Sequence, residues 1–215
     1  IAISDKNFSS FKKVCEIEIT INETRINDAK VDPYGGIVFG TYNEDPDKIN
    51  RKPIASLYRI APNLSITKLL SNITVSNGIA FSHKENIMYF ADTPTGLIRK
   101  FKYSQDFKKF QELESNMIFD DVGEPDGGTV DINNNYWSAR VRGSCIICID
   151  TTIEKIIQKI ELPTKTPTCL TFGGTDMQDL FVTSLRPKPI NNREDGNLFK
   201  VRSSAKGHLQ LLSEI

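Results

Sequence analysis

Short runs of β-branched and aromatic residues, separated by Gly, Pro, Asn and Asp, recur along the whole chain. Such runs with turn residues between them are typical of an all-β protein. Helical spacing of apolar positions is almost absent. Residues 153–160 follow the i, i+3, i+4 apolar spacing of a helix, but their β-branched content fits a strand equally well. We therefore expect an all-β fold, with this one segment left open between helix and strand.

Two kinds of unit repeat four times within this pattern. The first is a turn followed by an apolar run, and its steps are 50, 49 and 44 residues when it is aligned on Ile37, Ile87, Tyr136 and Leu180. The second unit is a further strand that follows each copy of the first unit. Its steps are 40, 49 and 52 residues when it is aligned on Leu57, Leu97, Ile146 and Leu198. A period in the forties built from short strands is typical of β-propeller blades. A β-sandwich, the alternative, would not repeat the same pair of units four times.

The repeat also sets the size of the array. The chain has 215 residues, which at this period hold four to four and a half blades. We expect residues 1–215 to form a single β-propeller domain, from which an N-terminal blade and a half or so is absent. The start, Ile1-Ala2-Ile3-Ser4, has no Met and no signal-peptide pattern, so we expect a processed or truncated N-terminus.

Composition removes several classes of function. The 27 basic and 27 acidic residues cancel, whereas a nucleic-acid-binding domain normally carries a basic excess. Apolar runs are only a few residues long, too short to span a bilayer. The four cysteines are too sparse for a disulfide scaffold. Cys145 and Cys148 have a CxxC spacing but lie in an apolar strand pattern, so we expect two core cysteines on opposite faces.

Few residues remain that could carry chemistry. The chain has two histidines, His83 in an expected turn and His208 near the C-terminus, and it has no Gly-x-Ser-x-Gly motif. Carboxylates, amides and a hard metal ion are then the available groups. Asn77 and Asp126 each precede a strand and lie 49 residues apart, which is one blade period. Equivalent positions in neighbouring blades would let them share a cation, although Asn-Gly and Asp-Gly are also common turn dipeptides.

Several short motifs occur in a fixed order and at blade-like intervals: Arg25-Ile-Asn-Asp-Ala-Lys-Val-Asp-Pro, Gly40-Thr, Ser76-Asn-Gly, Pro125-Asp-Gly, and Thr168-Cys-Leu-Thr-Phe-Gly-Gly. Over roughly residues 15–202 the chain resembles the gluconolactonase, regucalcin (senescence marker protein) and luciferin-regenerating enzyme family. This resemblance implies a six-bladed propeller with a divalent metal at its channel and, as in several members, lactone hydrolase activity.

The resemblance also implies roles for individual residues. Asn77 and Asp126 would bind the divalent cation (Ca²⁺, Zn²⁺, Mn²⁺ or Mg²⁺), and Asp126 would be the general base for a metal-bound water that attacks the ester carbonyl. Arg25 and Asn27 would contact a small lactone or sugar-like substrate. Ungapped counting places an acidic substrate contact at Asp45, with Glu44 as the alternative. Family members favour a cytoplasmic location, whereas four N-x-S/T sequons allow secretion.

The chain also departs from the family pattern. The remaining metal ligand of the family is a Glu in a Gly-Glu-x-Pro context ahead of its first full blade, and this motif is absent here. We expect that the segment carrying this Glu was lost or is supplied as a separate piece, or that the protein has an incomplete metal site. A non-catalytic propeller that binds a small ligand or Ca²⁺ is therefore the alternative function, and a phosphotriesterase-like hydrolase is a third. Residues 47–53 correspond to a lid loop in the family or are a solvated charged loop.

Overall fold

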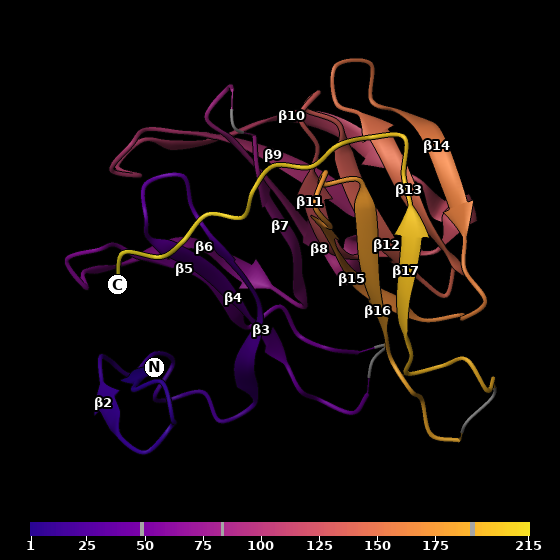
Figure 1. Cartoon of the computed structure of the whole chain (residues 1–215). Coiled ribbons are helices and arrows are strands. Elements are labelled where there is room, and N and C mark those ends of the chain that lie inside the picture. Colours follow the sequence, from indigo (N-terminus) through magenta and orange to yellow (C-terminus); the bar gives the residue numbers. More distant parts are fainter. Residues whose placement is uncertain (48–49, 83, 190–191) are drawn as a thin grey trace.

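Four β-sheets are arranged around a common axis as successive blades of a propeller (Figure 1). The computed structural model describes residues 1–47, 50–82, 84–189 and 192–215. The expected turn at His83 and part of the expected lid loop, residues 48 and 49, lie outside the described residues. A short hairpin of β1 (Ala2–Ser4) and β2 (Phe11–Lys13) precedes the blades.

Each blade is an antiparallel meander that begins at the central axis. Blade 1 consists of β3 (Thr24–Val31), β4 (Ile37–Asn43), β5 (Ala55–Ile60) and β6 (Ile66–Ile73). Blade 2 consists of β7 (Ser76–Phe81), β8 (Ile87–Asp92), β9 (Leu97–Tyr103) and β10 (Phe110–Ile118). Blade 3 consists of β11 (Glu124–Val130), β12 (Tyr136–Val141), β13 (Cys145–Asp150) and β14 (Lys155–Glu161). Blade 4 has three strands among the described residues, β15 (Pro167–Gly173), β16 (Asp179–Ser184) and β17 (Leu198–Arg202).

The propeller prediction is confirmed, and the repeat units coincide with the strands. The four anchors of the first unit lie in the second strand of each blade, and the four anchors of the second unit lie in the third strand. The open segment 153–160 resolves as strand, because it contributes most of β14. The described helices are two short 3-10 turns, η1 (Thr93–Thr95) and η2 (Asp120–Val122). No helix in the described part of the chain is long and apolar enough to cross a lipid bilayer.

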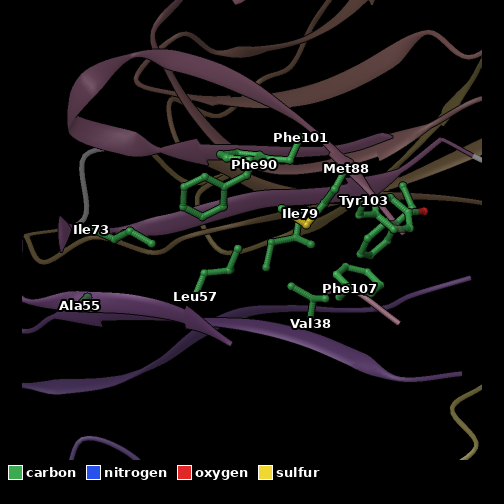
Figure 2. Packing of buried hydrophobic residues seen from close by; sticks show 11 residues of the cluster. Val38, Ala55, Leu57, Ile73, Ile79, Met88, Phe90, Phe101, Tyr103 and Phe107 are labelled. Atoms are coloured by element: carbon green, nitrogen blue, oxygen red, sulfur yellow. The ribbon is translucent and has the colours of Figure 1, made fainter. Parts of the chain in front are cut away.

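The hydrophobic core lies between the blades, in one layer for each pair of neighbours. Figure 2 shows the layer between blades 1 and 2, where Val38 and Leu57 face Ile79, Met88 and aromatic rings of blade 2. Blades 2 and 3 share a second layer, and blades 3 and 4 share a third. The sheets of blades 2 and 3 therefore bury both faces, which explains why the strand β13 reads as an almost continuous apolar run.

The two cysteines of the CxxC sequence illustrate this layering. Cys145 packs in the layer shared by blades 2 and 3, whereas Cys148 packs in the layer shared by blades 3 and 4. Both thiols are free and buried. The prediction of two core cysteines on opposite faces of one strand is confirmed, as residues three apart in a strand must point to opposite sides.

Buried polar side chains fix the turns between the first and second strands of the blades. The Asp32 carboxylate accepts hydrogen bonds from the Tyr34 and Gly36 amides and pairs with Arg59 at 2.6 Å. Asp131 occupies the same place in blade 3, where it accepts bonds from backbone amides and from Trp137 Nε1 at 3.0 Å. Both carboxylates are fully buried. They are satisfied by these donors, as buried charges must be.

After β17 the chain does not stop at blade 4 but runs back across the molecule toward blade 1 (Figure 1). We call residues 203–215 the C-terminal strap. Its Lys206 carbonyl accepts a bond from the Ile132 amide of blade 3, and its Gly207 amide donates to Met177 of blade 4. Farther along, the Glu214 amide donates to the Gly35 carbonyl of blade 1 at 2.9 Å. The strap therefore joins the first blade to the last two on one face of the propeller.

Candidate active site

The innermost strand of every blade has a break in its pairing register near its start. The breaks fall between Ile26 and Ala29 in β3, Asn77 and Ala80 in β7, Pro125 and Gly128 in β11, and Pro167 and Cys169 in β15. A bulge leaves one residue unpaired and re-aims its side chain. Because the innermost strands lie next to one another at the axis, all four bulges bring polar side chains to the same end of the channel.

This end of the channel contains a cavity of about 690 Å³. Three of the predicted site residues, Asn27, Asn77 and Asp126, line it. Each of the three belongs to a different blade, and each lies at or next to the register break of its inner strand. A volume of this size is within the range of small-molecule sites.

Hydrogen bonds across three blades hold the amide groups of the wall in place. Asn27 Nδ2 donates to the Ser76 carbonyl at 2.8 Å and to Asn77 Oδ1 at 2.9 Å. Asn77 Nδ2 donates to the Thr93 hydroxyl at 2.8 Å, and that hydroxyl donates to the Pro125 carbonyl at 2.8 Å. Asn77 is consequently held at both ends of its amide, with its nitrogen directed to Thr93 and its oxygen to Asn27.

Two carboxyl groups in the cavity wall have unusual titration behaviour. Desolvation, followed by the charge of Asp28, raises the pKa of Asp126 to about 7. Desolvation also raises the pKa of Asp28 to about 6, although the Ile79 amide donates to its Oδ2 at 2.9 Å. A carboxyl group with a pKa near neutrality can both accept and release a proton at physiological pH.

Close packing against the inner strands leaves no room for side chains at two glycines of this site. The Tyr136 hydroxyl donates to the Gly78 carbonyl at 2.8 Å, and a Cβ at Gly78 would come within 2.4 Å of the same hydroxyl. Gly78 also has a φ of +65°, a conformation that side chains other than glycine rarely adopt. At Gly127 a Cβ would lie 2.7 Å from Cys169 Sγ. The glycines that follow Asn77 and Asp126 are therefore required by the site wall.

Arg25 lies beside the cavity rather than among the residues that line it. Its Nε donates to Glu44 Oε1 at 2.6 Å, and its guanidinium carbon lies 4.5 Å from the centre of the Tyr42 ring. The Tyr42 hydroxyl donates to the same Glu44 oxygen at 3.1 Å. Arg25, Tyr42 and Glu44 thus form one cluster at the rim, of which Tyr42 reaches the cavity.

The two acidic candidates of the sequence prediction occupy different places. Asp45 accepts bonds from the Asp47 amide and lines a separate pocket of about 340 Å³ together with Thr20 and Asn43. Glu44, the alternative, is the residue that pairs with Arg25. The structure brings Asn27, Asn77 and Asp126 together, places Arg25 and Glu44 at their rim, and leaves Asp45 apart from them. The assignment of a substrate contact to Asp45 stays a prediction.

The donor set at the cavity fits a hard divalent cation. The Asn77 amide and the Asp126 carboxyl group supply the oxygen ligands that Ca²⁺, Mg²⁺ and Mn²⁺ prefer. The acidic pair Asp28 and Asp126 adds negative charge at the same wall, which a cation would offset. Among the described ranges, no group of three or more His, Cys, Asp and Glu side chains could hold a metal ion. Amide oxygen and water would therefore have to complete the coordination offered by these residues.

Some lining residues were not assigned a role from the sequence. Asp28, Thr93 and Thr168 contribute polar groups, and Arg51 and Arg142 contribute positive charge. Two of these could have been found from the period, because Asp28 lies 50 residues before Gly78 and Thr168 lies 42 residues after Asp126. The arginines come from the loops between the second and third strands of blades 1 and 3, and these loops differ in length, so the period does not align the two residues.

Comparisons with known proteins agree with this architecture. The profile described as "SMP-30/Gluconolactonase/LRE-like region" matches residues 1–186. Regucalcin of Danio rerio is 31% identical over 183 residues, which cover 81% of this chain and 59% of that protein. The 6-deoxy-6-sulfogluconolactonase of Pseudomonas putida is 28% identical over 176 residues, with coverage of 81% and 59%. The chain thus spans about 59% of the length of these relatives.

Solved structures show the same fold. A luciferin-regenerating enzyme superposes with a TM-score of 0.86 at 26% sequence identity, and the match covers 96% of this chain and 71% of that one. The described blades therefore have the arrangement found in that propeller.

Proposed function

Because the chain belongs to the SMP-30/gluconolactonase/LRE-like family, we propose that it takes part in the hydrolysis of a small lactone at the channel cavity. The observation that carries the proposal is the convergence of Asn27, Asn77 and Asp126 on one cavity of about 690 Å³. A relative that shares this sequence pattern is named as a lactonase, and others are named regucalcin.

A divalent cation held by Asn77 and Asp126 would supply Lewis acidity, polarising the ester carbonyl and making water more acidic. Asp126 is the residue proposed to accept the proton of the attacking water, and its pKa of about 7 suits that role near neutral pH. Asn27 donates its amide hydrogens to the Ser76 carbonyl and to Asn77 Oδ1, so it would hold a substrate hydroxyl through its own amide oxygen. Arg25, which is paired with Glu44 at the rim, would hydrogen-bond a hydroxyl of the substrate.

Water activation requires that Asp126 be deprotonated before the attack. Its neighbour Asp28 disfavours the ionised form, whereas a cation at the site would favour it. Asp126 would take one proton from the attacking water as the C–O bond to the carbonyl carbon forms. When the ring C–O bond breaks, Asp126 would pass that proton to the leaving alkoxide, which becomes the hydroxyl of the product, and the new carboxylic acid loses its own proton to solvent. Because the product acid is anionic at neutral pH, the same acidic pair would favour its release.

A second candidate function is non-catalytic binding of a cation or small ligand in the same cavity. The observation that favours it is the small ligand set, since the described residues provide no group of three acidic, histidine or cysteine ligands. Propellers support many functions on one architecture, so the fold does not decide between the two candidates.

Hydrolysis of glucono-1,5-lactone, with and without Ca²⁺, Zn²⁺, Mn²⁺ or Mg²⁺ and after chelation, tests the proposal. We expect activity that depends on the metal and falls by about 10²–10⁴-fold in Asp126→Ala, the range typical of a lost general base. The variant Asp121→Ala, which removes an exposed carboxylate of η2, is the control. Activity that survives both chelation and Asp126→Ala would exclude this mechanism. Calorimetric cation binding without any hydrolysis would support the second candidate.

A further inference from the structure

Arg51 brings a positive charge into the channel cavity from the loop between β4 and β5. It lines the cavity of about 690 Å³ together with Tyr42 and Asn27. Its Nε donates to the Asp45 carbonyl at 2.7 Å, and its guanidinium carbon lies 5.8 Å from the centre of the Tyr42 ring. One backbone bond and one aromatic face therefore restrict the side chain, and it is half-buried.

The other arginines around this cavity are neutralised by carboxylates. Arg142, which also lines it, pairs with Glu124, and Arg25 at the rim pairs with Glu44 at 2.6 Å. Arg51 forms no ion pair with a carboxylate of residues 1–47, 50–82, 84–189 or 192–215. Its hydrogen bond through Nε goes to a neutral carbonyl oxygen. Among these three arginines, Arg51 is thus the one whose charge is left for a ligand.

A guanidinium group binds carboxylate and phosphate through two parallel hydrogen bonds, and it does so more strongly when water is partly excluded. We propose that Arg51 makes the site selective for lactones that carry an oxyanion substituent, either a carboxylate or a phosphate. The inference rests on the proposed function for the identity of the reacting group, but the oxyanion contact itself does not require hydrolysis.

The charges of the wall define which way such a substrate would lie. Asp28, Glu124 and Asp126 are acidic groups on blades 1 and 3, and they would repel an anionic substituent. Tyr42 lies in β4 of blade 1, and Arg51 lies in the loop between β4 and β5. A lactone carbonyl placed at Asn77 and Asp126 would therefore direct its oxyanion toward Arg51, and the Tyr42 ring would contact the apolar face of the sugar.

Two sets of three compounds test the inference. The first set contains glucono-1,5-lactone, 6-phosphoglucono-1,5-lactone and, with a carboxylate, D-glucaro-1,4-lactone. The second set contains the stable acids gluconate, 6-phosphogluconate and, as the dicarboxylate, glucarate, whose binding is measured by calorimetry. The variants are Arg51→Gln, which removes the charge, and Arg51→Lys, which keeps the charge but loses the planar fork. Lys109→Gln removes one positive charge from the exposed turn between β9 and β10, at the opposite ends of the strands, and is the matched control.

We expect the ratio of kcat/KM for the anionic over the neutral lactone to fall by roughly 10–100-fold in Arg51→Gln, as expected for loss of a charge-assisted bidentate bond. Arg51→Lys should give an intermediate ratio, and Lys109→Gln should match the parent protein. A larger loss with the phosphate or with the carboxylate compound identifies the preferred oxyanion. Equal losses on neutral and anionic lactones would overturn the inference.

The binding arm separates this inference from the proposed function. If no lactone is hydrolysed, tighter binding of 6-phosphogluconate or glucarate than of gluconate, lost in Arg51→Gln, still supports the oxyanion contact. If lactones are hydrolysed but the parent protein binds the three acids equally, the proposed function stands and the role of Arg51 is refuted. Thermal unfolding of all variants shows whether a loss comes from the fold instead.

Discussion

Within the candidate active site, the carboxyl groups of Asp28 and Asp126 lie in surroundings unlike those of an ordinary surface carboxylate. Desolvation raises the pKa of both, and the charge of Asp28 raises that of Asp126 further. The folded state therefore disfavours the ionised forms of both carboxyl groups, and ionising them lowers the stability of the metal-free protein. A site that has this property is well suited to a cation, because binding removes the same unfavourable interaction.

The first prediction concerns stability as a function of pH in the chelated protein. The folded-state pKa of Asp126, about 7, lies above its ordinary value of 3.8, so the unfolded state binds fewer protons between these pH values. The free energy of unfolding should therefore fall as pH rises from 4 to 7. Asp126→Asn should remove most of this slope and be more stable than the parent by about 2–4 kcal/mol at pH 8, since each pKa unit corresponds to about 1.4 kcal/mol.

Urea unfolding at pH 4, 6 and 8 with chelator measures this effect. Asp121→Asn, an exposed carboxyl group in η2, should keep the slope of the parent. The prediction fails if Asp126→Asn and the parent lose stability equally as the pH rises.

The second prediction separates the two acidic neighbours at the cavity rim. Glu44 holds Arg25 through an ion pair of 2.6 Å and accepts a bond from the Tyr42 hydroxyl, whereas Asp45 accepts a bond from the Asp47 amide and lines a separate pocket. Glu44→Gln should therefore reduce kcat/KM for the lactone about 10-fold more than Asp45→Asn does, because Arg25 loses its charged partner. Steady-state kinetics of both variants decide between them, and the reverse order would support Asp45 as the substrate contact.

At the scale of the element, the turns and bulges of the inner strands matter more than strand propensity. The turn carboxylates Asp32 and Asp131 are buried and make several bonds each, and they fix where the second strand starts. The bulges near the starts of the inner strands then direct Asn27, Asn77 and Asp126 to the cavity. A register shift of one residue at a turn or a bulge would turn these side chains to the opposite face of the strand, away from the cavity.

The third prediction is that Asp131→Ala destabilises the protein by about 3 kcal/mol. The substitution leaves Trp137 Nε1 and two backbone amides without their acceptor, and each buried donor left unpaired costs about 1–3 kcal/mol. Asp131→Asn keeps one acceptor oxygen and should cost less. Asp106→Ala removes a similar turn carboxylate from an exposed position and should cost below about 1 kcal/mol.

Denaturant unfolding followed by the fluorescence of Trp137, the one tryptophan of the chain, provides the measurement. If the Asp131 and Asp106 variants lower the free energy of unfolding equally, burial of the turn carboxylate does not contribute to stability.

The sequence predicted the second and third strands of each blade well, because the period repeats their apolar positions. It predicted that Asn77 and Asp126 occupy equivalent positions, since one period separates them, but the pairing register aligns Asn77 with Pro125, one residue before Asp126. It did not predict the choice between Glu44 and Asp45, because a single register shift exchanges their faces. It did not indicate Arg51 or Thr93 either, since these residues reach the cavity through loops whose course depends on contacts between blades.

At the scale of the whole molecule, the blades are held together by three apolar layers and by the C-terminal strap. The strap covers a second cavity, of about 230 Å³, formed by the far ends of β3, β7 and β11 and by residues 208–211. This cavity and the candidate active site lie at opposite ends of the inner strands. The last residue of the strap, Ile215, packs against the cluster of Phe39, Tyr58 and Ile60 on the outer face of blade 1.

The fourth prediction is that removal of residues 208–215 lowers the free energy of unfolding by about 1–3 kcal/mol, the value of one or two apolar side chains. It should also increase binding of an apolar dye, because the far end of the channel and the outer face of blade 1 become accessible. Leu212→Ala changes a side chain that is 86% exposed and is the control. Unchanged stability of the shortened protein would show that the strap lies on the blades without holding them.

The contact between the strap and blade 1 has a consequence for how the protein is made. Ser213 and Gly35 are separated by 178 positions in the sequence. Each blade can form from consecutive hairpins as it leaves the ribosome, whereas this contact must wait until nearly all of the chain has emerged. During synthesis, the bond between the strap and Gly35 is therefore among the last contacts of these blades to form.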